Sequence, residues 1–273
     1  MVFEQLFKPR WLEARPKWSF LIGIFYTTVG ILSALIVFPQ SVGLISIAFT
    51  SLLILPTLNR LLAIEELEEI REKKLSLRLI YRDHKDVFET YIFLFLGILV
   101  TYSLFSLILD ELTIIHIFKS QLSLAGITGD AIALNYHEFF SLLLNNFKVL
   151  LVSFIFSLVY GAGAILFLTW NASVWGTIFG YIARQAAQAT NQNVFVAFAS
   201  LFIKVLPHTV LEVSSYLLAI IAGGIISKAT IKEKLGSKKF NHVLTDGFII
   251  FTVALLLIIF AAYVEVFVFP VFL

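Results

Sequence analysis

Three ionisable residues lie within or at the start of strongly apolar stretches in the second half of the chain: His208, Glu212 and Glu265. A carboxylate inside hydrocarbon is costly, and such a residue tends to persist only where function or pairing requires it. His208 and Glu212 are four residues apart, so in a helix they share one face. A histidine and two carboxylates can coordinate a divalent cation, pass a proton or hold a polar head group. The alternative is a hydrogen-bonded cluster that only locks two helices together, because buried acids require partners.

Other motifs for catalysis or cofactor binding are absent from the sequence. A single histidine is a weak metal signature, and no HExxH motif supplies two imidazoles with a general base. There is no nucleotide loop, dinucleotide fingerprint or serine nucleophile elbow, and the lack of cysteine excludes thiol catalysis and disulfides. We therefore expect no resident cofactor and favour a protein that is not an enzyme. If a divalent cation is bound, His208, Glu212 and Glu265 are its candidate ligands.

The composition is that of a membrane protein. Of the 273 residues, 59% are hydrophobic and only 14% are charged, and the mean hydropathy is +0.94. Such a chain cannot give a water-soluble globule a polar exterior, so we expect an all-α, polytopic protein with a single integral membrane domain over residues 1–273. The lipid bilayer is then a partner, whereas a net charge of +2 is too small to indicate nucleic-acid binding.

About seven transmembrane helices are expected, because a bilayer core of roughly 30 Å requires about 20 apolar residues in helical form. The clear candidates are residues 20–38, 42–62, 91–109, 147–168, 209–227 and 248–268. Two shorter stretches, 174–189 and 194–205, are ambiguous because each carries a cation and Pro207 interrupts the second. We expect 174–189 to cross and 194–205 to be a re-entrant or interfacial half-helix. Residues 1–19 mix cations with large apolar residues and predict an interfacial N-terminal helix.

Basic residues set the predicted orientation, since cytoplasmic loops of membrane proteins are enriched in Lys and Arg. Such residues concentrate in the N-terminal segment, in the loop 60–85 and in the loop 228–239. All three segments are therefore expected in the cytoplasm. With seven crossings, the protein is a multi-pass component of the cell membrane with a cytoplasmic N-terminus and an extracytoplasmic C-terminus.

This topology brings the polar residues to one depth. From Gly247 to Glu265 a helix rises about 27 Å, which places the acid near the outer face. The preceding span runs the other way, so His208 and Glu212 start at that same face. Asn145 and Asn146 precede the fourth span on the outside and are further candidates for the polar site.

The second half of the chain resembles a known family. The residues that carry the likeness are Asn145-Asn146, Gly161, Leu206-Pro207-His208, Glu212, Gly223-Gly224, Ala261-Ala262-Tyr263-Val264-Glu265 and Pro270. Together they resemble the stage II sporulation protein M family, also known as the DUF95 integral membrane family, over residues 145–270. Thr209 stands where the family often has glycine after Pro-His. The resemblance implies a prokaryotic membrane protein; the sporulation member is a membrane partner of wall-degrading proteins in septal peptidoglycan remodelling.

Three functions remain open at this point. The leading hypothesis is a multispan scaffold or anchor that organises a membrane or cell-envelope complex through the outer polar site, with envelope proteins as partners. The second is a transporter or channel-like protein for a small solute or ion, because ionisable residues and interrupted helices are used in gated pathways. The third is an intramembrane metal-assisted hydrolase. The Gly176–Gly180 notch could support a homo-oligomer, although packing within one bundle is its commoner use.

Overall fold

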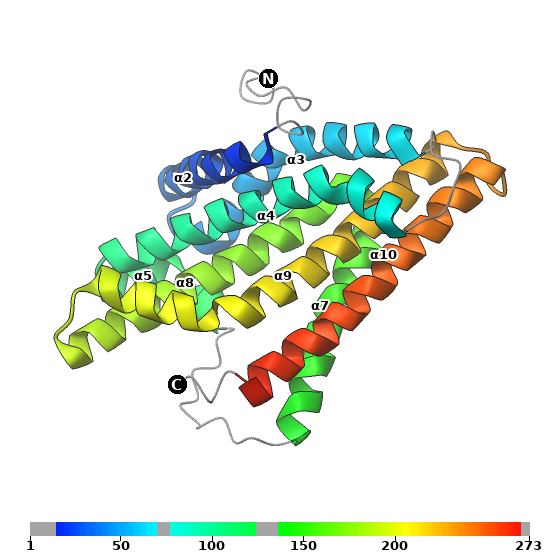
Figure 1. Ribbon diagram of the computed structural model, residues 1–273. Helices are drawn as coiled ribbons and strands as arrows, with labels where there is room; N and C mark the ends of the chain where they lie inside the picture. Colours follow the sequence, from blue (N-terminus) through cyan, green and yellow to red (C-terminus); the bar gives the residue numbers. More distant parts are fainter. Residues whose placement is uncertain (1–14, 70–76, 124–135, 269–273) are drawn as a thin grey trace.

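The computed structural model describes residues 15–69, 77–123 and 136–268, and all regular elements in these ranges are helical (Figure 1). Seven helices in this part of the chain are long and apolar enough to cross a membrane, which confirms the predicted class and span count. The long helices are α2 (Ser19–Val37), α3 (Val42–Glu69), α4 (Leu77–Ile108), α7 (Tyr136–Tyr160), α8 (Ile165–Thr190), α9 (Val194–Lys232) and α10 (Lys238–Tyr263). The short ones are η2 (Pro16–Trp18), α5 (Glu111–Ile117), α6 (Lys119–Leu122), η4 (Gly161–Ala164) and η5 (Val264–Val268). Most of the predicted N-terminal interfacial helix lies outside the described residues.

The predicted boundary of the fourth span is wrong. Residues 147–168 were expected to form one helix, but α7 ends at Tyr160 and α8 begins at Ile165. Gly161 has a φ of +58°, a left-handed conformation that glycine adopts without steric cost, and it is the first residue of the η4 turn. The apolar stretch continues across this turn, so hydropathy alone cannot locate it. Residues 174–189 are consequently the second part of the longer helix α8.

The predicted separate half-helix over residues 194–205 is also wrong. These residues form the first turns of α9, which continues through Pro207 to Lys232. Proline removes one intrahelical hydrogen bond and tends to kink a helix rather than always ending it. Figure 1 shows α9 changing direction along its length, between its first turns and the part that packs beside α10.

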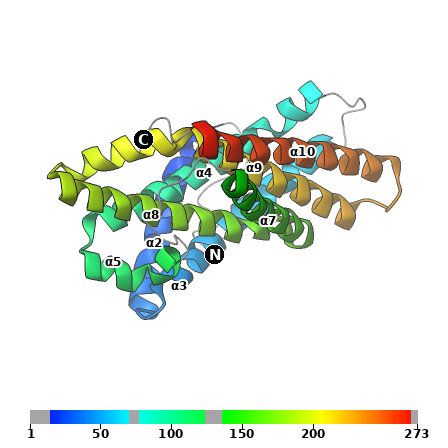
Figure 2. The same ribbon diagram turned by 90° about the horizontal axis from the view of Figure 1, so that it is seen from below.

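The long helices pack in two groups that meet where α8 packs against α9. In the first, α4 packs along α2 and α8, and α2 also packs on α3; in the second, α9 lies between α7 and α10 (Figures 1 and 2). The predicted Gly176–Gly180 notch faces α4. A Cβ on Gly180 would lie 2.8 Å from the carbonyl oxygen of Ser103, so this notch serves packing within the chain.

Candidate functional site

The central element of the candidate site is one face of α9. His208, Glu212 and Tyr216 follow one another at four-residue spacing, and the Tyr216 hydroxyl donates a hydrogen bond of 2.7 Å to Glu212 Oε1. Glu212 is only 8% exposed and Tyr216 is buried, whereas His208 is half-buried. A buried acid therefore has a built-in donor one turn along its own helix.

Glu265 reaches this face from the other end of the chain. It lies in η5, a π-helical turn that continues α10 and packs against α9. Its carboxyl group interacts electrostatically with the carboxyl group of Glu212 and with the hydroxyl group of Tyr216. The packing of η5 against α9 follows from the antiparallel arrangement of α9 and α10. Like charges repel one another more strongly in a poorly solvated place than in water, so the charge of one acid affects the other.

The start of α7 lies beside η5. The rings of Phe139 and Phe267 are 5.8 Å apart, and Phe267 also lies against Tyr263, with ring centroids 5.2 Å apart. Aromatic residues of α7 and α10 therefore flank the turn that carries Glu265.

The paired asparagines on α7 have different environments. Asn145 is exposed, whereas Asn146 is only 3% exposed and its Nδ2 is buried without a hydrogen-bond partner. Asn145 Nδ2 donates to Asn146 Oδ1 at 3.5 Å, the limit of a hydrogen bond.

The packing register places Asn146 at about the depth of Glu212. Along the contact between α7 and α9, Ser157 Oγ of α7 donates to the Ile220 carbonyl of α9 at 2.5 Å, and Leu150 of α7 shares an apolar cluster with Tyr216 of α9. The two helices therefore run in the same direction. Asn146 lies one turn before Leu150 in α7, and Glu212 lies one turn before Tyr216 in α9. Asn146 and Glu212 therefore lie at about the same depth, although Asn146 Nδ2 does not donate to Glu212.

The geometry does not offer a ready metal site. Among the described residues, no three His, Asp or Glu side chains are grouped so that they could hold a metal ion. His208, Glu212 and Glu265 are all in the described part of the chain, so these three candidate ligands do not form such a group.

Two polar features were not singled out from the sequence. Tyr216 was missed although it continues the four-residue spacing of His208 and Glu212. His242 and Asp246 form an i,i+4 pair in α10, with Nε2 and Oδ2 3.4 Å apart, and Asp246 is buried. The same spacing that marked His208 and Glu212 marks this pair, which lies near the end of α10 opposite η5.

Arg184, a cation within the predicted span 174–189, has a structural partner. Its guanidinium donates to the carbonyl oxygens of Leu107, in the last turn of α4, and of Leu109, directly after that helix. Nearby, Tyr181 donates to Glu111 at 3.2 Å. These bonds hold the short helix α5 and the end of α4 against α8.

The comparisons with known proteins give one match. The family model for stage II sporulation protein M matches residues 88–270, which extends from α4 through η5 and covers more than half of the chain. No curated protein and no solved structure matches the chain. The family match and the seven apolar helices together establish that this chain is a membrane protein belonging to the stage II sporulation protein M family.

Proposed function

We propose that this protein is a multispan scaffold that organises a cell-envelope complex. In this proposal Glu212, Tyr216 and Glu265 fix the packing of η5 against α9, and the partner binds at this end of the protein. The observation that carries the proposal is the packing of η5, the π-helical turn that carries Glu265, against α9, whose buried Glu212 is held by a hydrogen bond from Tyr216 of the same helix. A buried acid whose hydrogen bond comes from within the protein is consistent with a rigid scaffold.

The surface around this end supports a membrane-embedded protein partner. Phe140 and Leu144 are exposed on the first turns of α7, and Tyr263 is exposed at the end of α10. Exposed aromatic and aliphatic side chains beside a buried polar site can pack against a helix of another membrane protein. Envelope proteins and further copies of this chain are therefore the proposed partners.

The proposed orientation places this end outside the cytoplasm. The turn between α9 and α10 and the helix ends beside it carry four exposed lysines, Lys232, Lys234, Lys238 and Lys239, and such basic segments remain preferentially in the cytoplasm. The Glu265 end, at the other end of α10, then faces the cell envelope. The N-terminus is cytoplasmic and the C-terminus extracytoplasmic in this arrangement.

The test is recovery of the complex from native membranes. Tagged wild-type protein carrying a photocrosslinking residue at Tyr263 is compared with the same protein carrying Glu265→Gln or His208→Ala. We expect the crosslinked partner to fall about tenfold, the loss that follows from about 1.4 kcal/mol of binding energy. Glu233→Gln, at the opposite end of α9, is the matched control and should leave recovery unchanged. Equal recovery from all four proteins would contradict the proposal.

A proton- or ion-coupled transporter is the second candidate, because ionisable pairs lie near both ends of α10. Glu265 with Glu212 and His242 with Asp246 are separated by about 28 Å along the helix, close to the hydrocarbon thickness. Buried ionisable residues in membrane helices often mark ion or proton pathways. Proteoliposomes with an internal pH dye test this idea: flux that Glu212→Gln abolishes would favour transport over the scaffold, and no flux across a broad ion and metabolite panel would remove it.

A further inference from the structure

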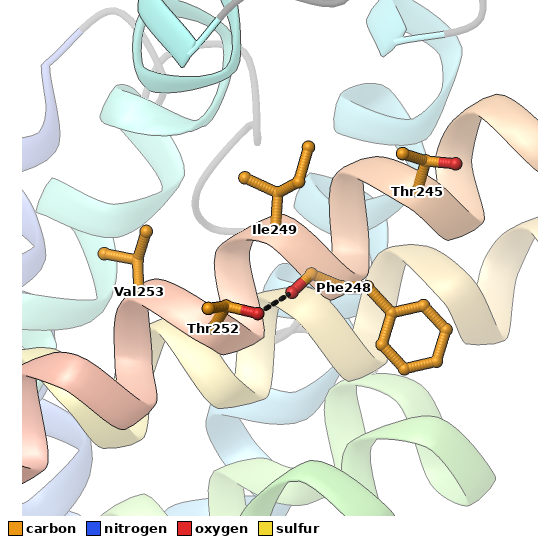
Figure 3. Close-up of a pocket in the computed structure, with 5 residues that line it drawn as sticks. All are labelled: Thr245, Phe248, Ile249, Thr252 and Val253. Carbon is orange, nitrogen blue, oxygen red and sulfur yellow. Dashed lines mark hydrogen bonds between the residues drawn. The ribbon is translucent and has the colours of Figure 1, made fainter.

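A groove runs along one face of α10, away from the polar site. It has a volume of about 370 Å³ and is lined by Thr245, Phe248, Ile249, Thr252 and Val253 (Figure 3). These residues recur at intervals of three and four, so they form one stripe along the helix. The stripe lies in a helix that is apolar enough to cross a membrane.

The groove is apolar in spite of its two threonines. The Thr252 hydroxyl donates to the Phe248 carbonyl, and the Thr245 hydroxyl donates to the Asn241 carbonyl, each at 2.8 Å (Figure 3 shows the first). Because both threonine hydroxyls donate within the helix, neither needs a hydrogen-bond partner from a ligand. The threonine methyl groups can therefore contribute to an apolar surface. Phe248 is 54% exposed, so the groove opens to the surroundings of α10. A hydrocarbon chain fits such a surface.

A positive charge lies at one end of the same stripe. Lys238 precedes Thr245 by seven residues, so it occupies the same face of α10 about 10 Å nearer the helix start. Its side chain is exposed, and the N-terminal end of α10 adds the positive pole of the helix dipole. The turn before it presents exposed Ile231 and Leu235 among the lysines, a mixture typical of the membrane interface. An anionic head group therefore finds complementary charge directly beyond the groove.

We propose that α10 binds an anionic phospholipid from the leaflet at the α9–α10 turn. One acyl chain lies in the groove from Thr245 to Val253, and the phosphate lies beside Lys238 at the start of the helix. This site is independent of the proposed scaffold function, because it involves neither Glu212 nor Glu265.

Native mass spectrometry of the full-length protein in detergent tests the proposal. Phosphatidylglycerol and phosphatidylcholine with identical acyl chains are titrated separately. We expect phosphatidylglycerol to bind more tightly and Lys238→Gln to weaken its binding about fivefold, the change expected for one lysine near an anionic membrane surface. Lys239→Gln is the matched control, since it removes the same charge from the same end of α10 but about 100° around the axis.

A second pair of variants tests the groove itself. Thr252→Trp fills it and should reduce phosphatidylglycerol binding at least as strongly as Lys238→Gln, whereas Leu52→Trp, on an exposed face of α3, should not. Equal weakening by Lys238→Gln and Lys239→Gln would overturn the proposal in favour of a diffuse basic surface. Unchanged binding to Thr252→Trp, with loss of a dimer in the same spectra, would overturn it in favour of a second copy of the chain on this face.

Discussion

Tyr216 solves a problem that Glu212 creates in the interior of the protein. A buried carboxyl group without a donor loses the hydrogen bonds that water would supply, and lipid cannot replace them. The Tyr216 hydroxyl lies 2.7 Å from Glu212 Oε1 and comes from the same helix, so the bond forms with local helix structure. The interaction with Glu265 depends instead on the packing of η5 against α9.

Removing this hydroxyl is expected to destabilise the protein. Tyr216→Phe keeps the ring packing but leaves Glu212 without its donor, and we expect a loss of about 1 kcal/mol in the free energy of unfolding. Unfolding by sodium dodecyl sulfate in mixed micelles, followed by circular dichroism, measures the change. Tyr160→Phe removes a hydroxyl from an exposed tyrosine and should have no effect. Equal stability of Tyr216→Phe and wild type would show that the bond contributes nothing.

The exposed residue Asp110 gives a prediction about pH. The Thr113 hydroxyl and then the Thr113 backbone N–H donate to this carboxylate and hold its pKa below the ordinary value of 3.8. Because the folded-state pKa is depressed, this contribution to stability is present above pH 3.8 and is lost as the pH falls through the folded-state value. Thr113→Val should raise the pKa of Asp110 toward 3.8, measurable from its carboxyl carbon by NMR after selective labelling. Gln185→Leu, which leaves Thr113 in place, should leave this pKa unchanged.

At the scale of elements, the contact between α4 and α8 depends on small residues. Gly180→Val would place side-chain atoms against the backbone of Ser103 and the side chain of Ser106, and overpacking of this kind costs about 1–3 kcal/mol. Ala186→Val, at an exposed position of α8, adds a β-branched residue without this clash and serves as the control. A lower thermal unfolding temperature is expected for Gly180→Val alone. If both variants unfold at the wild-type temperature, α4 and α8 do not need the notch.

The elements also show which parts of the fold could be predicted from the sequence. Length and hydropathy sufficed for the helical class and the number of spans, because each crossing needs a long apolar run. They failed at Gly161, where the chain turns within an apolar stretch, and at Pro207, where α9 continues through a residue that often ends a helix. Both outcomes depend on backbone conformation and tertiary packing.

The candidate site was partly predictable for the same physical reasons. The packing of η5, which carries Glu265, against α9 follows from two antiparallel helices joined by a short turn, so the depth of each acid could be counted along the chain. The different burial of Asn145 and Asn146 could not be predicted, because it depends on which face of α7 packs against α9. The absence of a three-residue metal group among the described residues likewise depends on side-chain positions.

At the scale of the whole molecule, the proposed orientation can be tested without altering a background of native thiols, because the chain contains no cysteine. Ser41→Cys, in the turn between α2 and α3, and Gln192→Cys, between α8 and α9, should react with a membrane-impermeant maleimide added to intact cells. Ser237→Cys, in the basic turn before α10, should react only after the membrane is permeabilised. Labelling of Ser237→Cys in intact cells with protection of the other two would reverse the orientation.

The π-helical form of η5 makes the direction of Glu265 sensitive to chain length. A π turn accommodates one residue more than the α turn it replaces, and each residue of an α-helix advances the chain by about 100° around the axis. A relative that lacked one residue between Gly247 and the acid could regain regular α geometry, and its carboxyl group would then point about a quarter-turn away from α9. Members of the family that can bring this acid beside Glu212 are therefore distinguished by the direction in which the acid points from its helix, and not only by the presence of an acid at this position.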